Sequence, residues 1–116
     1  SSYDDLFGHP TVGSSWEGYV IEQIYQLKRN NIGLFFYRTQ AGAECDLVLV
    51  EGIKPIACIE IKLSNSPSVS KGFINCMADL ELQKGFLITP QSDTYTSKEV
   101  EIISLSNFLK HILPNL

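Results

Sequence analysis

The spacing of hydrophobic residues changes along this 116-residue chain, and the changes mark out helices and strands. Between residues 10 and 30 the hydrophobic positions recur every three or four residues, which predicts one amphipathic helix. A helix turns by about 100° per residue, so these positions gather on a single arc that should face the core. The residues of this arc are Trp16, Val20, Ile21, Ile24 and Leu27.

Glu17 falls near the middle of the apolar arc. A carboxylate on a buried stripe needs a partner or faces a site, because unpaired buried charge is costly. A structural interpretation is also open: Ser14 and Glu17 have the spacing of a capping box. That interpretation requires a helix that starts at Ser14, whereas Pro10 in a first turn would start it earlier and place Glu17 inside.

Short apolar runs bounded by turn residues follow this helix and predict strands. The first three strands are joined by turns at 40–43 and 51–54, so they should be antiparallel. The remaining pattern predicts a helix, a strand, a polar loop, a strand and a closing helix. In chain order, the elements expected after the first helix are strands 34–38, 44–50 and 55–63, helix 68–80, strand 84–89, loop 91–98, strand 100–104 and helix 106–113.

The order of these elements predicts the fold class. The helix between the third and fourth strands favours a right-handed crossover, which makes those two strands parallel. The central strands are apolar on both faces, so helices should cover both faces. We therefore expect an α/β fold: a three-layer α/β/α domain around a central mixed sheet.

Composition narrows the functional classes. The apolar fraction of 44% and charged fraction of 19% are ordinary for one globular domain. The apolar runs are too short to span a bilayer and no signal peptide opens the chain, so we expect a cytoplasmic protein without a membrane partner. The net charge of −4 argues against a sequence-independent nucleic-acid binder acting alone. It leaves room for a nuclease domain whose partner supplies the basic surface.

The three cysteines, Cys45, Cys58 and Cys76, lie in apolar runs and have no Cys-x-x-Cys spacing. Three reduced, buried thiols are the expected arrangement. Neither His9 nor His111 lies at ligand spacing from a cysteine pair, so a zinc site is not expected.

Charged residues interrupt the second and third strands where the two strands should meet. Side chains alternate along a strand, so Glu44 shares a face with Asp46, and Glu60 shares one with Lys62. The intervening hairpin brings Asp46 opposite Glu60, or within a residue or so of it. Carboxylates are the ligands that Mg²⁺ or Mn²⁺ prefers, and Lys62 could hold a water or a phosphate oxygen beside the ion. The alternatives are a salt-bridged strand end and a lysine that reaches solvent.

Arg38 and Glu44 flank the first turn and should lie nearly opposite each other. A cross-strand ion pair is the expected role for both. Arg38 could instead contact a phosphate, and Glu44 could support a metal ligand from outside.

Asp46 followed after a hairpin by Glu60-Ile61-Lys62 resembles the D…(D/E)-x-K signature of the PD-(D/E)XK nuclease superfamily. The order of the elements, with Glu17 on the first helix, is also similar to that superfamily's core. The proline that often precedes the superfamily's aspartate is replaced by Cys45.

A closer resemblance covers residues 9 to 113. It is to the C-terminal domain of prokaryotic AAA-type ATPases, domain of unknown function 4143. The motifs that carry it are His9-Pro10-x-Val12-Gly13-x-x-x-Glu17-x-x-Val20, Tyr37-Arg38-Thr39-x-x-Gly42-x-Glu44-x-Asp46 and Ile59-Glu60-Ile61-Lys62.

The resemblance implies a restriction-endonuclease-like fold with Glu17, Asp46 and Glu60 as metal ligands and Lys62 as catalytic lysine. It also implies an N-terminal ATPase module as partner, so residues 1–8 are expected to be a linker or tag remnant before a nuclease-like domain at 9–116. The expected function is Mg²⁺-dependent hydrolysis of DNA. The alternative is a catalytically silent protein-interaction or nucleic-acid-binding module of the same ATPase.

Overall fold

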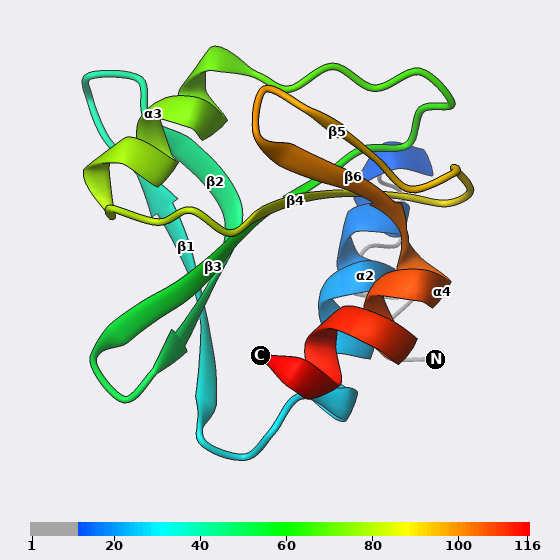
Figure 1. Ribbon diagram of the computed structural model, residues 1–116, viewed down its shortest axis with the longest axis horizontal. Coiled ribbons are helices and arrows are strands. Elements are labelled where there is room, and N and C mark those ends of the chain that lie inside the picture. The colour runs from blue at the N-terminus through cyan, green and yellow to red at the C-terminus, as the bar shows by residue number, and fades with distance from the viewer. Residues whose placement is uncertain (1–11) are drawn as a thin grey trace.

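A six-stranded mixed sheet forms the centre of the structure, a computed structural model that describes residues 12–116, with side chains from Ser15 onward (Figure 1). The expectations for residues 1–8, His9 and Pro10 lie outside the described residues. The elements are α2 (Val12–Leu27), β1 (Ile32–Arg38), β2 (Glu44–Glu51), β3 (Lys54–Ile61), α3 (Lys71–Asp79), β4 (Gly85–Thr89), β5 (Tyr95–Ser97), β6 (Val100–Ser104), α4 (Leu105–Asn107), the π-helical turn η1 (Phe108–Ile112) and the 3₁₀ turn η2 (Leu113–Asn115).

The strands follow the order β1-β2-β3-β4-β6-β5 across the sheet. The first three are antiparallel neighbours, as their short turns predicted. β4 lies parallel to β3, as the helix between them predicted, and it also lies parallel to β6. The mixed α/β sheet is therefore confirmed.

Helices cover both faces of the sheet, as the apolar character of both strand faces predicted. α2 and the C-terminal helical segment lie on one face, where Val20, Ile24 and Phe108 pack against Leu49 and Ile59. α3 lies on the opposite face, where its buried side chains pack on β2, β3, β4 and β6 (Figure 1). Among the described residues, no helix has the length and apolarity needed to cross a membrane.

The prediction of a polar loop over 91–98 is wrong in part, because this segment contains the short edge strand β5. β5 pairs antiparallel with β6 alone, and a hairpin joins the two strands. Its two turn residues, Lys98 and Glu99, have φ values of 51° and 67°. Such turns usually carry Asn-Gly or Asp-Gly, so the hairpin lacks the sequence signal that would have predicted it.

The first helix decides between the two interpretations of Glu17, and its C-terminal end differs from the prediction. α2 already includes Val12, so Ser14 lies inside the helix and the capping-box interpretation of Glu17 is wrong. Leu27 was placed on the buried arc but is 58% exposed. It is the last residue of α2, and the buried stripe of this helix ends at Ile24.

Two further boundaries shift near the predicted site. β3 ends at Ile61, so Lys62 follows the strand instead of closing it. α3 begins at Lys71, and Ser70 rather than Ser68 is its N-cap residue, because the Ser70 hydroxyl accepts a hydrogen bond from the Phe73 backbone N–H.

Candidate functional site

A bulge in β2 decides where the Asp46 side chain lies. Between Phe35 and Tyr37 the ladder advances two residues along β1, whereas β2 advances three, from Val48 to Cys45. Cys45 and Val48 both pack on the α3 side of the sheet, while Leu47 packs on the α2 side. Bulges of this kind commonly re-aim a side chain beside a functional site.

The bulge brings Asp46 next to α2. Its Oδ2 accepts a hydrogen bond of 2.8 Å from the backbone N–H of Ile61, which ties the bulge to the end of β3. The Asp46 carboxylate also shares a hydrogen bond with the carboxyl group of Glu17. Regular alternation of side chains along β2 predicted that Asp46 and Glu60 would lie on the same face of the sheet. This prediction is wrong, because the extra residue of the bulge turns Asp46 to the α2 face.

Glu17 projects from the interior of α2 toward this carboxylate. Burial raises the pKa of Glu17, and the negative charge of Asp46 and the hydrogen bond between the two groups raise it further. The positive charge of Lys62 acts in the opposite direction, which places this lysine close enough to influence the pair. Two acids from α2 and β2 therefore lie side by side, and the charge of Lys62, just after β3, acts on Glu17.

The main chain of Lys62 is fixed from two sides. Its N–H donates to the Ile88 carbonyl at 3.0 Å, and its carbonyl accepts from the indole Nε1 of Trp16 at 3.2 Å. The ion pairs among the described residues join Arg29 to Glu51 and Arg38 to Glu44. Lys62 therefore does not complete the strand-end salt bridge with Asp46 or Glu60 that was the other interpretation.

Glu60 points to the opposite face of the sheet, toward α3. Only 8% of this residue is exposed, and its Oε2 accepts a hydrogen bond of 2.8 Å from the Ser70 hydroxyl. Ser70 N–H approaches the other carboxylate oxygen at 3.5 Å. The carboxylate is thus held at the start of α3, and sequence reasoning gave Ser70 no role because nothing in the strand pattern connects it with Glu60.

Arg38 and Glu44 form the predicted cross-strand pair, with Nη2 and Oε1 3.2 Å apart. Both side chains are exposed, so the pair adds little stability. They border a cleft of about 250 Å³ that reaches the Glu17–Asp46 pair. The other lining residues are Ile21, Phe36, Tyr37 and Cys45.

The three predicted metal ligands do not form one compact set. Within residues 12–116, the carboxylate oxygens of Glu17, Asp46 and Glu60 do not all lie within 4.8 Å of one another. Glu17 and Asp46 are adjacent and could hold a hard divalent cation between them. Glu60 would join them only after leaving Ser70, so its place among the ligands stays a prediction.

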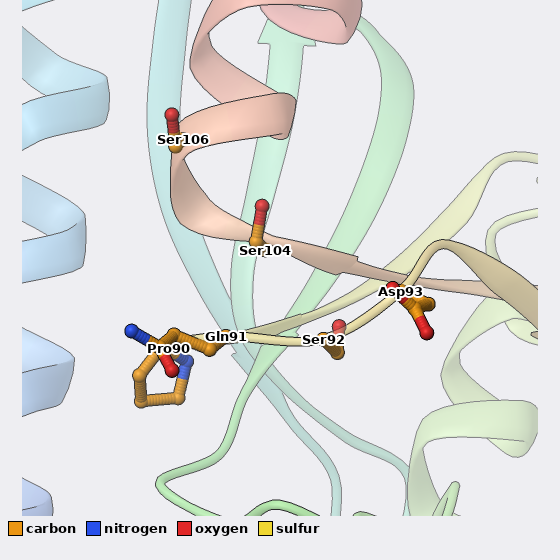
Figure 2. Close-up of a pocket in the computed structure, with 6 residues that line it drawn as sticks. All are labelled: Pro90, Gln91, Ser92, Asp93, Ser104 and Ser106. Atoms are coloured by element: carbon orange, nitrogen blue, oxygen red, sulfur yellow. The ribbon is translucent and has the colours of Figure 1, made fainter.

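A second, wider crevice of about 600 Å³ lies where β4 and β6 end. Figure 2 shows Pro90, Gln91, Ser92 and Asp93 along the loop after β4, with Ser104 and Ser106 where the chain enters α4. Asp93 is the one charged residue of its lining. The crevice therefore has polar groups but no cluster of acids, bases or ligands.

Comparison with known proteins identifies relatives of this chain. The family described as "Domain of unknown function (DUF4143)" matches residues 12–108. Two mycobacterial proteins, the uncharacterized protein Rv2008c of Mycobacterium tuberculosis (strain ATCC 25618 / H37Rv) and the uncharacterized protein Mb2031c of Mycobacterium bovis (strain ATCC BAA-935 / AF2122/97), are each 37% identical to it over 82 residues.

Those 82 residues are 71% of this chain but 18% of each relative, so the chain spans about a fifth of the curated proteins that it matches. No solved structure matches the chain. The family match covers every helix and strand from α2 to α4, together with Glu17, Asp46, Glu60 and Lys62. This chain therefore belongs to the DUF4143 family.

Proposed function

We propose that this domain is a divalent-metal-dependent phosphodiesterase of the PD-(D/E)XK type, with a restriction-endonuclease-like fold, that hydrolyses DNA. The observation that carries the proposal is the pair of Glu17 and Asp46 in an open cleft, with the charge of Lys62 acting on Glu17. A pair of acids with an adjacent lysine is the chemical equipment that metal-assisted hydrolysis of a phosphodiester needs.

The chain's own residues suit this chemistry. The Ile61 N–H donates to Oδ2 of Asp46 and so fixes the carboxylate in place. The other oxygen, Oδ1, can then face a cation while the carboxylate stays where it is. Glu17 carries its proton to higher pH than an ordinary glutamate, so a cation that displaced this proton would relieve the repulsion between the two acids. The residues therefore fit Mg²⁺ or Mn²⁺ as a cofactor.

When bound, Mg²⁺ would supply a Lewis acid that polarises a phosphoryl oxygen and lowers the pKa of a water molecule. The Lys62 ammonium group would neutralise charge that develops on the phosphate, from a main chain fixed by Trp16 and Ile88. Arg38, at the rim of the same cleft, would contact a neighbouring phosphate of the substrate.

Affinity for DNA must come mainly from outside this domain. Its net charge is −4, whereas sequence-independent binding depends on Lys and Arg at phosphates. The chain matches a fifth of the length of longer relatives. We propose that the remainder of the full-length protein, including an N-terminal ATPase module, supplies the basic surface.

The test is cleavage of supercoiled plasmid by the full-length protein in Mg²⁺ or Mn²⁺. Asp46→Asn and Lys62→Met should each lower the rate by about a hundredfold to a thousandfold, as the loss of one electrostatic group does in other enzymes. Glu22→Gln is the matched control, because Glu22 lies on the same helix as Glu17 and bonds to Gln26 instead. Equal cleavage by all four proteins would mean that the activity belongs to another site.

A second candidate is a catalytically silent module that docks on its own ATPase or on nucleic acid. The hydrogen bonds between Glu60 and Ser70 favour this candidate, because they keep one expected ligand on the α3 side of the sheet. Such a module should bind its partner equally well with and without Mg²⁺, and Lys62→Met should leave that binding unchanged.

A further inference from the structure

All three cysteines of the chain meet at one point between the sheet and α3. Cys45 comes from β2, Cys58 from β3 and Cys76 from α3, and their sulfur atoms lie within 4.8 Å of one another. The Sγ atoms of Cys58 and Cys76 are 3.7 Å apart. The residues are 13 and 18 positions apart in the sequence, so their spacing gave no sign of this meeting.

The cluster is buried and its surroundings are apolar. Cys58 and Cys76 are fully buried, and Cys45 is 3% exposed. The Cys45 thiol lies 2.9 Å from the Leu47 carbonyl and 3.4 Å from the Ile59 carbonyl, its polar neighbours apart from the other thiols. The other members of this core cluster are hydrophobic: Ala43, Val48, Val69, Phe73, Met77, Leu87, Val100 and Ile102.

We propose that Cys45, Cys58 and Cys76 form a three-thiolate binding site for a trivalent thiophilic ion. Arsenic(III) is an ion of this class and serves as the probe. Three sulfurs that each lie about 2.3 Å from one pyramidal ion, a distance typical of metal–thiolate bonds, are about 3.5 Å from one another. The Sγ atoms of Cys58 and Cys76, 3.7 Å apart, are already close to this separation, and all three sulfur atoms lie within 4.8 Å of one another. The ion would therefore need no large movement of β2, β3 or α3.

The negative charge of the three thiolates determines which valence of ion the site should prefer. Three thiolates carry three negative charges, and the groups that act most strongly on the three thiols include no cation, while Asp79 adds a negative charge near Cys76. A monovalent or divalent ion would leave a net negative charge in an apolar interior, which is costly. A trivalent ion gives a neutral complex, so it should be preferred to Zn²⁺ at this site.

The binding step needs no oxidant and no separate base. Arsenous acid, As(OH)₃, reacts with three thiols to give one tris-thiolate and three water molecules. Three S–H and three As–O bonds break, three As–S bonds form, and each thiol proton leaves with a hydroxide as water. Burial raises the pKa of the Cys76 thiol to about 12, so Cys76 brings its proton to this reaction, whereas the hydrogen bond with Cys58 lowers the pKa of Cys45.

The experiment uses the full chain, fully reduced, with sodium arsenite as the probe. One sample is incubated folded, and a second is refolded in arsenite because local opening limits entry to a buried site. Native mass spectrometry should show one arsenic per chain in place of three hydrogens, with all three thiols protected from alkylation. The midpoint of thermal unfolding should rise because the ion joins two strands to a helix.

Three single variants, Cys45→Ser, Cys58→Ser and Cys76→Ser, should each lose the three-hydrogen product. Met77→Leu is the matched control, because Met77 is buried in the same cluster but offers no thiol, and it should keep full binding. Circular dichroism of each variant separates loss of the site from loss of the fold. Cys45→Ala gives a second variant at the same position if serine is not tolerated.

Three results would overturn the proposal. The first is that neither sample retains arsenic. The second is that each of the three cysteine variants still retains it. The third is that the protein binds Zn²⁺ more tightly than arsenite. The third would reject the charge argument while leaving three thiols that bind a metal. None of these results depends on nuclease activity, so the proposed function is tested separately.

Discussion

Glu17 holds its proton to higher pH than an ordinary glutamate because it is partly buried beside Asp46. Its partner is fixed by the Ile61 N–H, so the strain between the two acids is not removed by rotation of Asp46. Proteins keep such repulsive pairs where a cation or a proton is needed, and functional sites are where shifted pKa values concentrate. At the scale of single residues, the pH dependence of the domain's stability can therefore show whether Glu17 and Asp46 form such a pair.

The pH dependence of stability follows from the direction of that shift. A glutamate whose pKa is raised by folding stabilises the folded state, and this contribution is fully present below its pKa in the unfolded chain, near 4.5. The contribution is lost as the pH rises through the pKa of the glutamate in the folded state. Glu17→Gln should remove this part of the pH profile and raise the free energy of unfolding at pH 7 by less than about 1 kcal/mol, because partly exposed pairs are screened. Urea unfolding from pH 4 to 8 measures both effects, with Glu22→Gln expected to follow the wild type.

Ser70 is the residue that joins α3 to Glu60. Ser70→Ala removes the hydroxyl that donates to Glu60 and accepts from Phe73, so it should cost about 1–3 kcal/mol of unfolding free energy. Ser104→Ala is a matched comparison, because Ser104 caps α4 but its hydroxyl has no carboxylate partner. Ser70→Thr, which keeps the hydroxyl, should recover most of the loss. Equal costs for Ser70→Ala and Ser104→Ala would show that the bond to Glu60 contributes nothing.

At the scale of elements, the hydrophobic pattern predicted α2, the first three strands, α3, β4 and β6, because each buries a stripe or a face that leaves a period in the sequence. It could not predict the bulge at Asp46, which depends on how β1 and β2 pair and not on the residues of either strand alone. The same limit applies to the three thiols, which meet only after β2, β3 and α3 have packed together. The Arg38–Glu44 pair was predictable because a single short turn sets its register.

The packing of α3 on the sheet requires a glycine in β4. A Cβ atom at Gly85 would overlap the sulfur of Met77 and lie 2.9 Å from its Cε. Gly85→Ala should therefore destabilise the domain by about 1 kcal/mol, at the low end of the cost of an overpacked core, because the flexible end of Met77 can shift. In a double-mutant cycle, Gly85→Ala should cost less in a Met77→Ala background than in the wild type. A cost that is independent of residue 77 would place the strain elsewhere in β4.

At the scale of the whole molecule, two sides of one sheet carry different chemistry. The α2 side holds Glu17 and Asp46 in an open cleft, and the α3 side buries Glu60 and three thiols. The two sides are connected through adjacent residues of β2, since Cys45 on the α3 side directly precedes Asp46 on the α2 side. The overall α/β arrangement was predictable from the order of elements, whereas this division between faces required the structure.

The measurement that tests the central claim most directly is a calorimetric titration of the folded domain with Mn²⁺ and Mg²⁺, beside Asp46→Asn, Glu17→Gln and Glu22→Gln. We expect one specific site in the wild type and in Glu22→Gln, and at least a tenfold weaker site, a loss of about 1.4 kcal/mol, in the two other variants. Binding that is absent from the folded wild type, or that is unchanged in Asp46→Asn, would contradict a metal centre at the Glu17–Asp46 pair.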